Sequence, residues 1–184
     1  MKQAETLGVV FLLSLLASCT SMGIKGQSDY DRTADFSSYK AFSWISKSPL
    51  VASGSAPILN PLFETYLKRS TMSELRRKGY QFVADPSNAD FVVAFTVGAR
   101  DMLRIDSYPS YYRGRYRWGG VYYQNVSTTR YTEGQVAIDV FDVRKRTPVW
   151  HGWATKRISK SDIQNPKPVL EEVVAAILAN YPPQ

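Results

Sequence analysis

Five stretches of the chain either alternate apolar and polar positions or are apolar throughout, over lengths typical of β-strands. In residues 135–143, Val136, Ile138 and Val140 fall on one face, which predicts a half-buried strand. Residues 91–97 are apolar on both faces, which predicts a central strand that is covered on both sides. The predicted strands are residues 38–45, 80–83, 91–97, 135–143 and 149–157.

Two further stretches repeat apolar residues every three or four positions, which is typical of helices with one buried face. The first begins at Asn60, which can cap a helix whose first position is Pro61, and it ends at Gly79, a residue that favours the C-terminal cap. The second begins at 165–166 and ends at the 181–183 segment, where two prolines stop it. The apolar rows are Phe63, Leu67, Thr71 and Leu75 in the first helix, and Val169, Leu170, Val173, Val174, Ile177 and Leu178 in the second.

The order of these elements is strand, helix, several strands, helix. The last two strands form a hairpin around a basic turn at 144–148, and a stretch rich in Gly, Ser, Pro and Ala follows the first strand. Two amphipathic helices over one antiparallel sheet bury both apolar stripes in the fewest layers. The pattern therefore predicts an α+β fold, a two-layer sandwich in which an antiparallel sheet of about five or six strands is covered by two helices.

The first residues of the chain predict export and a lipid anchor. Lys2 gives a positive start, and the apolar run 7–16 is too short to span a bilayer but suits the hydrophobic region of a signal peptide. The run ends in Leu16-Ala17-Ser18-Cys19, which resembles the lipobox of bacterial lipoprotein precursors. In that motif the Cys19 thiol takes a diacylglyceryl group, and cleavage follows behind Ser18.

The chain is therefore expected to contain a cleaved signal peptide at 1–18, a lipidated flexible tether at 19–29 and a single domain at 30–184. Cys19 is the sole cysteine, so no disulfide is expected and the core must stabilise the fold. Two acyl chains plus an amide-linked third exceed what stable membrane attachment needs. Thr20 in place of aspartate implies, by analogy with enteric lipoproteins, the outer membrane, with the domain in the periplasm.

The net charge of +7 favours anionic partners such as phospholipid headgroups, lipopolysaccharide phosphates or acidic wall polymers. Export makes nucleic acid an unexpected partner. A positive charge also serves solubility alone, so charge does not by itself define a ligand.

One segment, residues 108–123, is unusual in composition. It contains six tyrosines and one tryptophan interleaved with arginine and glycine, and no acidic residue lies between Asp106 and Glu133. Arginine and aromatic side chains suit stacking on sugar faces and pairing with anionic groups, and they are also typical anchors of protein interfaces. The other interpretation is a long β-hairpin arm or loop whose tyrosines pack on the sheet edge. The candidate binding residues are Tyr111, Tyr112, Arg113, Arg115, Arg117 and Trp118.

No catalytic, metal or cofactor site is expected. Asp139 and Asp142 lie three residues apart in a predicted strand and so point to opposite faces. We therefore expect Asp142 to stabilise the following turn and Asp139 to pair with a basic strand residue. His151 is the sole histidine, and neither a nucleophile elbow nor a set of metal ligands accompanies it.

Several short stretches in this order resemble a family of bacterial lipoproteins catalogued as domain of unknown function 4136. They are residues 29–31, 35–36, 39–40, 42–44, 75–80, 89–93, 134–142, 149–152, 177–178 and 181–183. The resemblance implies a lipid-anchored, envelope-facing α+β domain and no defined chemistry. We expect a non-catalytic binding or structural module of the envelope, whose partner is an anionic glycan, a lipid or an envelope protein. The alternative is an envelope hydrolase acting on glycan or lipid, with Asp139 or Glu133 at an unrecognised site.

Overall fold

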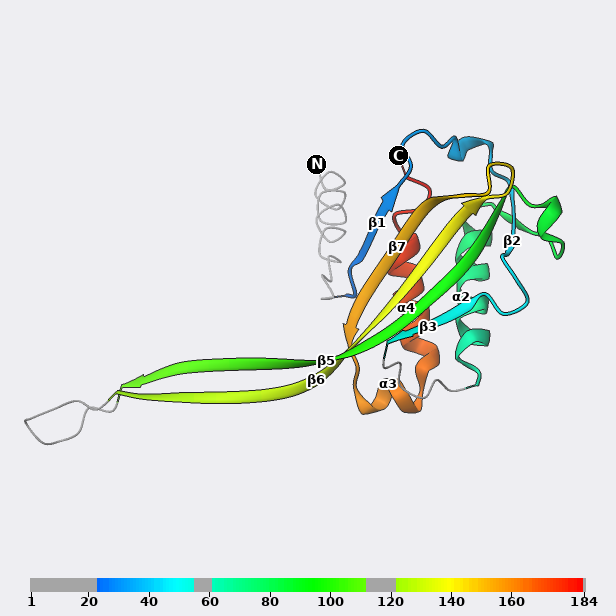
Figure 1. The fold of residues 1–184 in the computed structure, drawn as a ribbon. Helices are drawn as coiled ribbons and strands as arrows, with labels where there is room; N and C mark the ends of the chain where they lie inside the picture. Colours follow the sequence, from blue (N-terminus) through cyan, green and yellow to red (C-terminus); the bar gives the residue numbers. More distant parts are fainter. Residues whose placement is uncertain (1–22, 55–60, 112–121, 184) are drawn as a thin grey trace, which may run out of the picture.

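The structure, a computed structural model, describes residues 23–54, 61–111 and 122–183. Its strands form one sheet in the order β1-β7-β6-β5-β2-β4, with β3 pairing β5 off this path (Figure 1). The strands are β1 (Gly26–Tyr30), β2 (Ala41–Trp44), β3 (Leu50–Gly54), β4 (Gln81–Phe82), β5 (Phe91–Tyr111), β6 (Tyr122–Asp142) and β7 (Thr147–Arg157). The helices are α2 (Phe63–Arg77), α3 (Lys160–Gln164) and α4 (Pro166–Leu178), with short 3-10 turns η2 (Phe36–Ser38) and η3 (Pro86–Asn88).

The predicted α+β class and two-layer packing are confirmed, and the sheet is larger and more mixed than expected. Strands β1, β7, β6 and β5 are antiparallel neighbours, whereas β2 and β3 run parallel to β5 and β4 runs parallel to β2. The parallel pair β2–β4 follows from α2, because a helix that carries the chain back along the sheet lets the next strand start in the same direction.

Helices α2 and α4 pack against each other and cover one face of the sheet (Figure 1). The β5 residues Phe91, Val93 and Phe95 are almost fully buried among the core side chains. On the opposite face, Val92 is buried, whereas Ala94 and Thr96 are half-buried. Because both long helices lie on the same side of the sheet, the expectation that this strand is covered on both faces is met at Val92 and not at Ala94 and Thr96.

The C-terminus of α2 follows the predicted capping. Gly79 adopts φ +94°, and its N–H donates to the Arg76 carbonyl at 2.9 Å while the Tyr80 N–H donates to the Leu75 carbonyl at 3.0 Å. This pair of bonds is a Schellman motif, which needs a left-handed residue after the last turn. At the other end, the helix begins at Phe63 rather than at residue 61, and the predicted cap Asn60 lies outside the described residues.

The sheet also includes residues that were expected to belong to the tether. Gly26 to Tyr30 pair antiparallel with β7, so the folded body begins at residue 26 rather than at residue 30. A side chain at Gly26 has no room, since its Cβ would lie 2.0 Å from the Ala176 carbonyl oxygen of α4. The core residues that the structure describes run from Ile24 to Tyr181.

The helices within the described ranges are too short or too polar for any of them to cross a membrane.

Candidate functional site

Strands β5 and β6 continue well beyond the rest of the sheet. They pair with each other in unbroken register from Phe91–Asp142 to Tyr111–Tyr122. Their neighbours stop earlier, since β3 ends opposite Ala99 and β7 ends opposite Glu133. We call residues 100–111 and 122–133 the arm; Figure 1 shows it running away from the sheet and helices. At about 3.3 Å per residue it extends on the order of 37 Å.

Polar contacts tie the two strands of the arm together at its base. Arg100 pairs with Glu133, with Nη2 to Oε2 at 2.8 Å and Nε to Oε2 at 3.0 Å. The Thr132 hydroxyl donates to Asp101 Oδ1 at 2.9 Å, and the Arg157 guanidinium lies 4.9 Å from the Tyr131 ring. These contacts fix where the arm leaves the sheet, and they engage Glu133 in an ion pair.

Beyond the base of the arm, where Glu133 pairs with Arg157 and the Ile158 N–H donates to the Thr132 carbonyl at 2.9 Å, the described parts of β5 and β6 pair only with each other. Each strand there has one edge without a backbone partner. Such an edge presents N–H and C=O groups that can pair with another chain. A two-stranded hairpin is also only marginally stable alone in water. A long arm of this kind gains stability when a partner covers it.

The predicted binding residues belong to the segment that joins the two strands of the arm. The backbone of Tyr111 pairs with that of Tyr122. Tyr112, Arg113, Arg115, Arg117 and Trp118 lie outside the described residues, as do Ser18 and Cys19 of the predicted lipobox. The prediction of a hairpin across this part of the chain is thus confirmed for its strands, while the roles of these side chains stay predictions.

Asp139 and Asp142 point to opposite faces of β6, as the spacing predicts. Asp139 lies on the face away from the helices, where its Oδ1 is 2.6 Å from His151 Nδ1 on β7. The His151 ring stacks on Trp153 with centroids 5.0 Å apart. The predicted basic partner of Asp139 is therefore His151, on an exposed face of the sheet.

Asp142 is buried and stabilises the β6–β7 turn. Its Oδ1 accepts the backbone N–H of Lys145 at 2.7 Å, and its Oδ2 accepts the Tyr39 hydroxyl at 2.7 Å. Burial by itself raises the pKa of this carboxyl, but the hydrogen bonds from Lys145 and Tyr39 outweigh burial and hold the pKa below its usual value. Burial, together with the carboxylate, raises the pKa of the Tyr39 hydroxyl.

Sequence reasoning missed a second polar pair, at the end of β7. Lys156 Nζ lies 2.6 Å from Asp162 Oδ2, and Asp162 forms a reciprocal capping box with Ser159 at the start of α3. Burial by itself raises the pKa of Asp162, but the hydrogen bonds from Lys156 and Ser159 lower it by more, so the pKa lies below its usual value. The Ser-x-x-Asp spacing is the signal in the sequence that predicts such a cap.

Within the ranges that the structure describes, no three His, Cys, Asp or Glu side chains gather closely enough to hold a metal ion.

The chain matches one protein family, described as a domain of unknown function (DUF4136), over residues 26–183. A DUF4136 family protein from Bacteroides thetaiotaomicron has a similar crystal structure, with a TM-score of 0.55 at 16% identity. That similarity covers 87% of this chain and 97% of the other. At this level of identity it shows a common fold.

Weaker structural similarities extend to two further proteins. The PelC dodecamer from Paraburkholderia phytofirmans has a TM-score of 0.47 at 16% identity, covering 84% of this chain and 96% of that one. A PDZ domain protein from Parabacteroides distasonis has a TM-score of 0.49 at 13% identity, covering 98% of this chain and 40% of that one. A comparison with curated proteins produced no match.

Proposed function

The chain belongs to the DUF4136 family, and from that premise we propose that it is a lipid-anchored protein of the bacterial envelope that binds a partner through its arm. The observation that carries the proposal is the arm itself, a two-stranded extension whose outer edges, beyond the base at Thr132 and Glu133, have no backbone partner among the described residues. Proteins cover or blunt such edges unless the edges are used.

The proposal of a lipid anchor rests on the sequence of residues 16–19. Strand β1 begins at Gly26, so only a few residues separate the lipid from the folded body. Because residue 20 is threonine and not aspartate, we propose that the anchor lies in the outer membrane, with the folded body in the periplasm. Cells fed a radioactive fatty acid should label the wild-type protein and leave the Cys19→Ala variant unlabelled. A Cys19→Ala protein that still carries label contradicts the anchor.

The arm offers two ways to bind. Its free strand edges suit β-augmentation, in which an extended segment of another protein adds a strand. The Tyr- and Arg-rich residues that join its strands suit an anionic glycan, an anionic lipid or an envelope protein. Each of these partners occurs in the envelope.

A binding role is favoured over an envelope hydrolase because the two candidate catalytic carboxylates, Asp139 and Glu133, are already engaged by other side chains. Asp139 is paired with His151 and Glu133 with Arg100. The two carboxylates also belong to different contacts, on the open sheet face and at the base of the arm.

The test is a pull-down from detergent-solubilised envelopes with the chain from Thr20 to Gln184, which keeps every core residue that the structure describes. A shortened version replaces residues 101–132 by Asn-Gly, a dipeptide that favours a two-residue hairpin turn and leaves Arg100 opposite Glu133. The matched control is Lys145→Gln, in the exposed turn between β6 and β7.

We expect the intact chain and the Lys145→Gln variant to retain the same partner and the shortened version to lose it. All three should show cooperative thermal unfolding, so that loss of binding is not loss of the fold. A partner retained equally by the shortened version would place binding elsewhere and end the proposal for the arm.

A further inference from the structure

An apolar cavity of about 110 Å³ lies where β5, β6 and β7 reach the base of the arm, between the sheet and the helices α3 and α4. Its floor is formed by the buried side chains of Val136, Ala154, Leu170 and Val173. Ile163 of α3 lines it at the rim and remains 59% exposed. The volume is well above the roughly 10–15 Å³ that a single water needs by the same measure, and apolar cavities take up apolar guests. The cavity is also open on one side, so a guest can enter from solvent.

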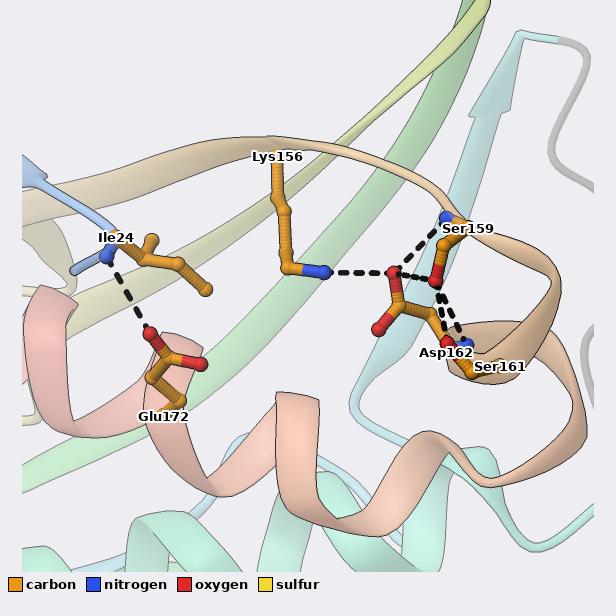
Figure 2. Close-up of polar contacts among 6 residues, drawn as sticks. All are labelled: Ile24, Lys156, Ser159, Ser161, Asp162 and Glu172. Atoms are coloured by element: carbon orange, nitrogen blue, oxygen red, sulfur yellow. Dashed lines mark hydrogen bonds and ion pairs between the residues drawn. The ribbon is translucent and has the colours of Figure 1, made fainter. Parts of the chain in front are cut away.

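Among the described residues that line the cavity, two are charged: Lys156 and Asp162 (Figure 2). The Lys156 ammonium has three N–H donors, and the structure uses one of them on Asp162 Oδ2 at 2.6 Å. Asp162 Oδ2 is also engaged by the backbone N–H and hydroxyl of Ser159, at 2.9 and 2.7 Å. The lysine therefore keeps donors for an anionic group, while the carboxylate beside it is already held by the capping box.

The start of the folded chain passes beside this cavity. Gly26 pairs with Ala154 of the cavity floor, and the Ile24 N–H donates to Glu172 Oε1 of α4 at 3.4 Å (Figure 2). From Cys19 to Gly26 an extended chain spans at most about 24 Å. If Cys19 carries the lipid of the proposed function, the cavity lies within that reach of the membrane surface.

We propose that this cavity is a binding site for the alkyl chain of an anionic amphiphile, such as a fatty acid, whose head is held by Lys156. The apolar floor buries methylene groups, and the ammonium at the rim binds the carboxylate or phosphate. The proposal rests on the proposed function only for the source of the ligand, because binding itself is a property of the folded body.

The first test uses the chain from Thr20 to Gln184, which carries no lipid, titrated with straight-chain alkanoates of four to ten carbons by calorimetry. Affinity should rise about fourfold for each added methylene, the gain expected for full burial, until the cavity is filled, and then level off. Affinity that does not depend on chain length, or no binding at all, overturns the proposal.

The role of Lys156 is tested by comparing octanoate with octanol. The intact chain should bind octanoate at least threefold more tightly. The double variant Lys156→Met/Asp162→Asn keeps the apolar stem, removes both charges and should bind the two ligands alike. Lys167→Met is the matched control, since this exposed lysine of α4 pairs with Glu171 outside the cavity and should keep the preference for octanoate. An unchanged preference in the double variant refutes the head-group contact.

The floor is tested with Ala154→Leu, which fills the cavity and should reduce octanoate affinity at least tenfold. Because overpacking can unfold a domain, Ile163→Ser at the exposed rim serves as the second variant, with a severalfold loss expected. Wild-type affinity in folded forms of both variants places the ligand elsewhere.

A comparison of the lipidated protein, purified from membranes, with the chain from Thr20 tells whether the cavity holds the lipid on Cys19 or a separate molecule. The acyl chains on Cys19 have no anionic head for Lys156. If they fill the cavity, the lipidated protein binds no octanoate, whereas the chain from Thr20 does, and an anionic amphiphile is not the ligand in the membrane. If a separate lipid is the ligand, both bind equally. Failure of fatty-acid labelling at Cys19 would remove the anchor and leave the alkanoate result standing.

Discussion

The Tyr39 hydroxyl donates a 2.7 Å hydrogen bond to Asp142 Oδ2, and so joins two residues that are 103 positions apart in the sequence. Tyr39 follows the η2 turn, and Asp142 ends β6. Both side chains are buried, and the carboxylate also holds the β6–β7 turn through the Lys145 N–H. One contact therefore links the entry of the chain into β2 to the last turn of the sheet.

Tyr39→Phe should destabilise the protein by about 1–3 kcal/mol at pH 7, because it removes the hydroxyl donor from a buried carboxylate. The pKa of Asp142 is lowered in the folded state, so its stabilising contribution is present above the unfolded pKa and is lost as pH falls through the folded pKa. The penalty should therefore be largest at pH 7 and shrink as the pH is lowered through the folded pKa. Urea unfolding over a series of acidic pH values measures this, and a penalty that stays constant down to full protonation of the carboxyl would contradict the assignment.

Gly152→Ala should cost at least about 1–3 kcal/mol, because an added Cβ would lie 2.1 Å from Cη2 of Trp150. Trp150 is 1% exposed, so a shift of its ring would disturb the packed core around it. Thr155→Ala, at an exposed position of the same strand, is the control and should change stability by less than about 0.5 kcal/mol. Equal urea midpoints for the two variants would show that the tryptophan can repack.

Gly79→Ala should cost about 1–2 kcal/mol for a different reason. No atom lies within 4 Å of an added Cβ, so the cost comes only from the φ of +94°. Gly79→Asn should cost less, because asparagine tolerates the left-handed region better than alanine. Chemical denaturation of the two variants compares them, and an alanine variant as stable as wild type would argue against the Schellman cap.

Arg100→Gln should change the free energy of unfolding by less than about 1 kcal/mol, although its ion pair with Glu133 is 2.8 Å long. The arginine side chain is 68% exposed, so water and salt screen the pair. The small effect should shrink further at high salt. A loss of several kcal/mol, measured by thermal unfolding at two salt concentrations, would mean that this pair is needed to hold the two strands together at the base of the arm.

Sequence periodicity located the elements whose structure depends on neighbours along the chain. The rows of apolar residues predicted α2 and α4 within a few residues of their ends, and Gly79 marked the end of α2. The opposite directions of Asp139 and Asp142 follow from the geometry of any strand. In each case the physical cause lies within a few residues of the position concerned.

Sequence periodicity did not predict the strands whose formation depends on residues far away in the sequence. Strand β3 lies in a stretch rich in Ser, Gly, Pro and Ala, and exists because Leu50 to Gly54 pair with β5. Strand β1 lies in the expected tether and is held by β7. Backbone groups pair whatever their side chains, so composition alone does not reveal such strands.

The sequence by itself determined the family, the α+β class, the two long helices and the expected lipid site at Cys19. Only the tertiary structure decided which side chains meet: Tyr39 with Asp142, His151 with Asp139, and Lys156 with Asp162 above an apolar cavity. The tertiary structure also decided that β5 and β6 extend beyond the other strands of the sheet and form an arm. The reason is physical: helical periodicity is a local property of the chain, whereas strand register, and every contact that it brings about, depends on residues far apart in sequence.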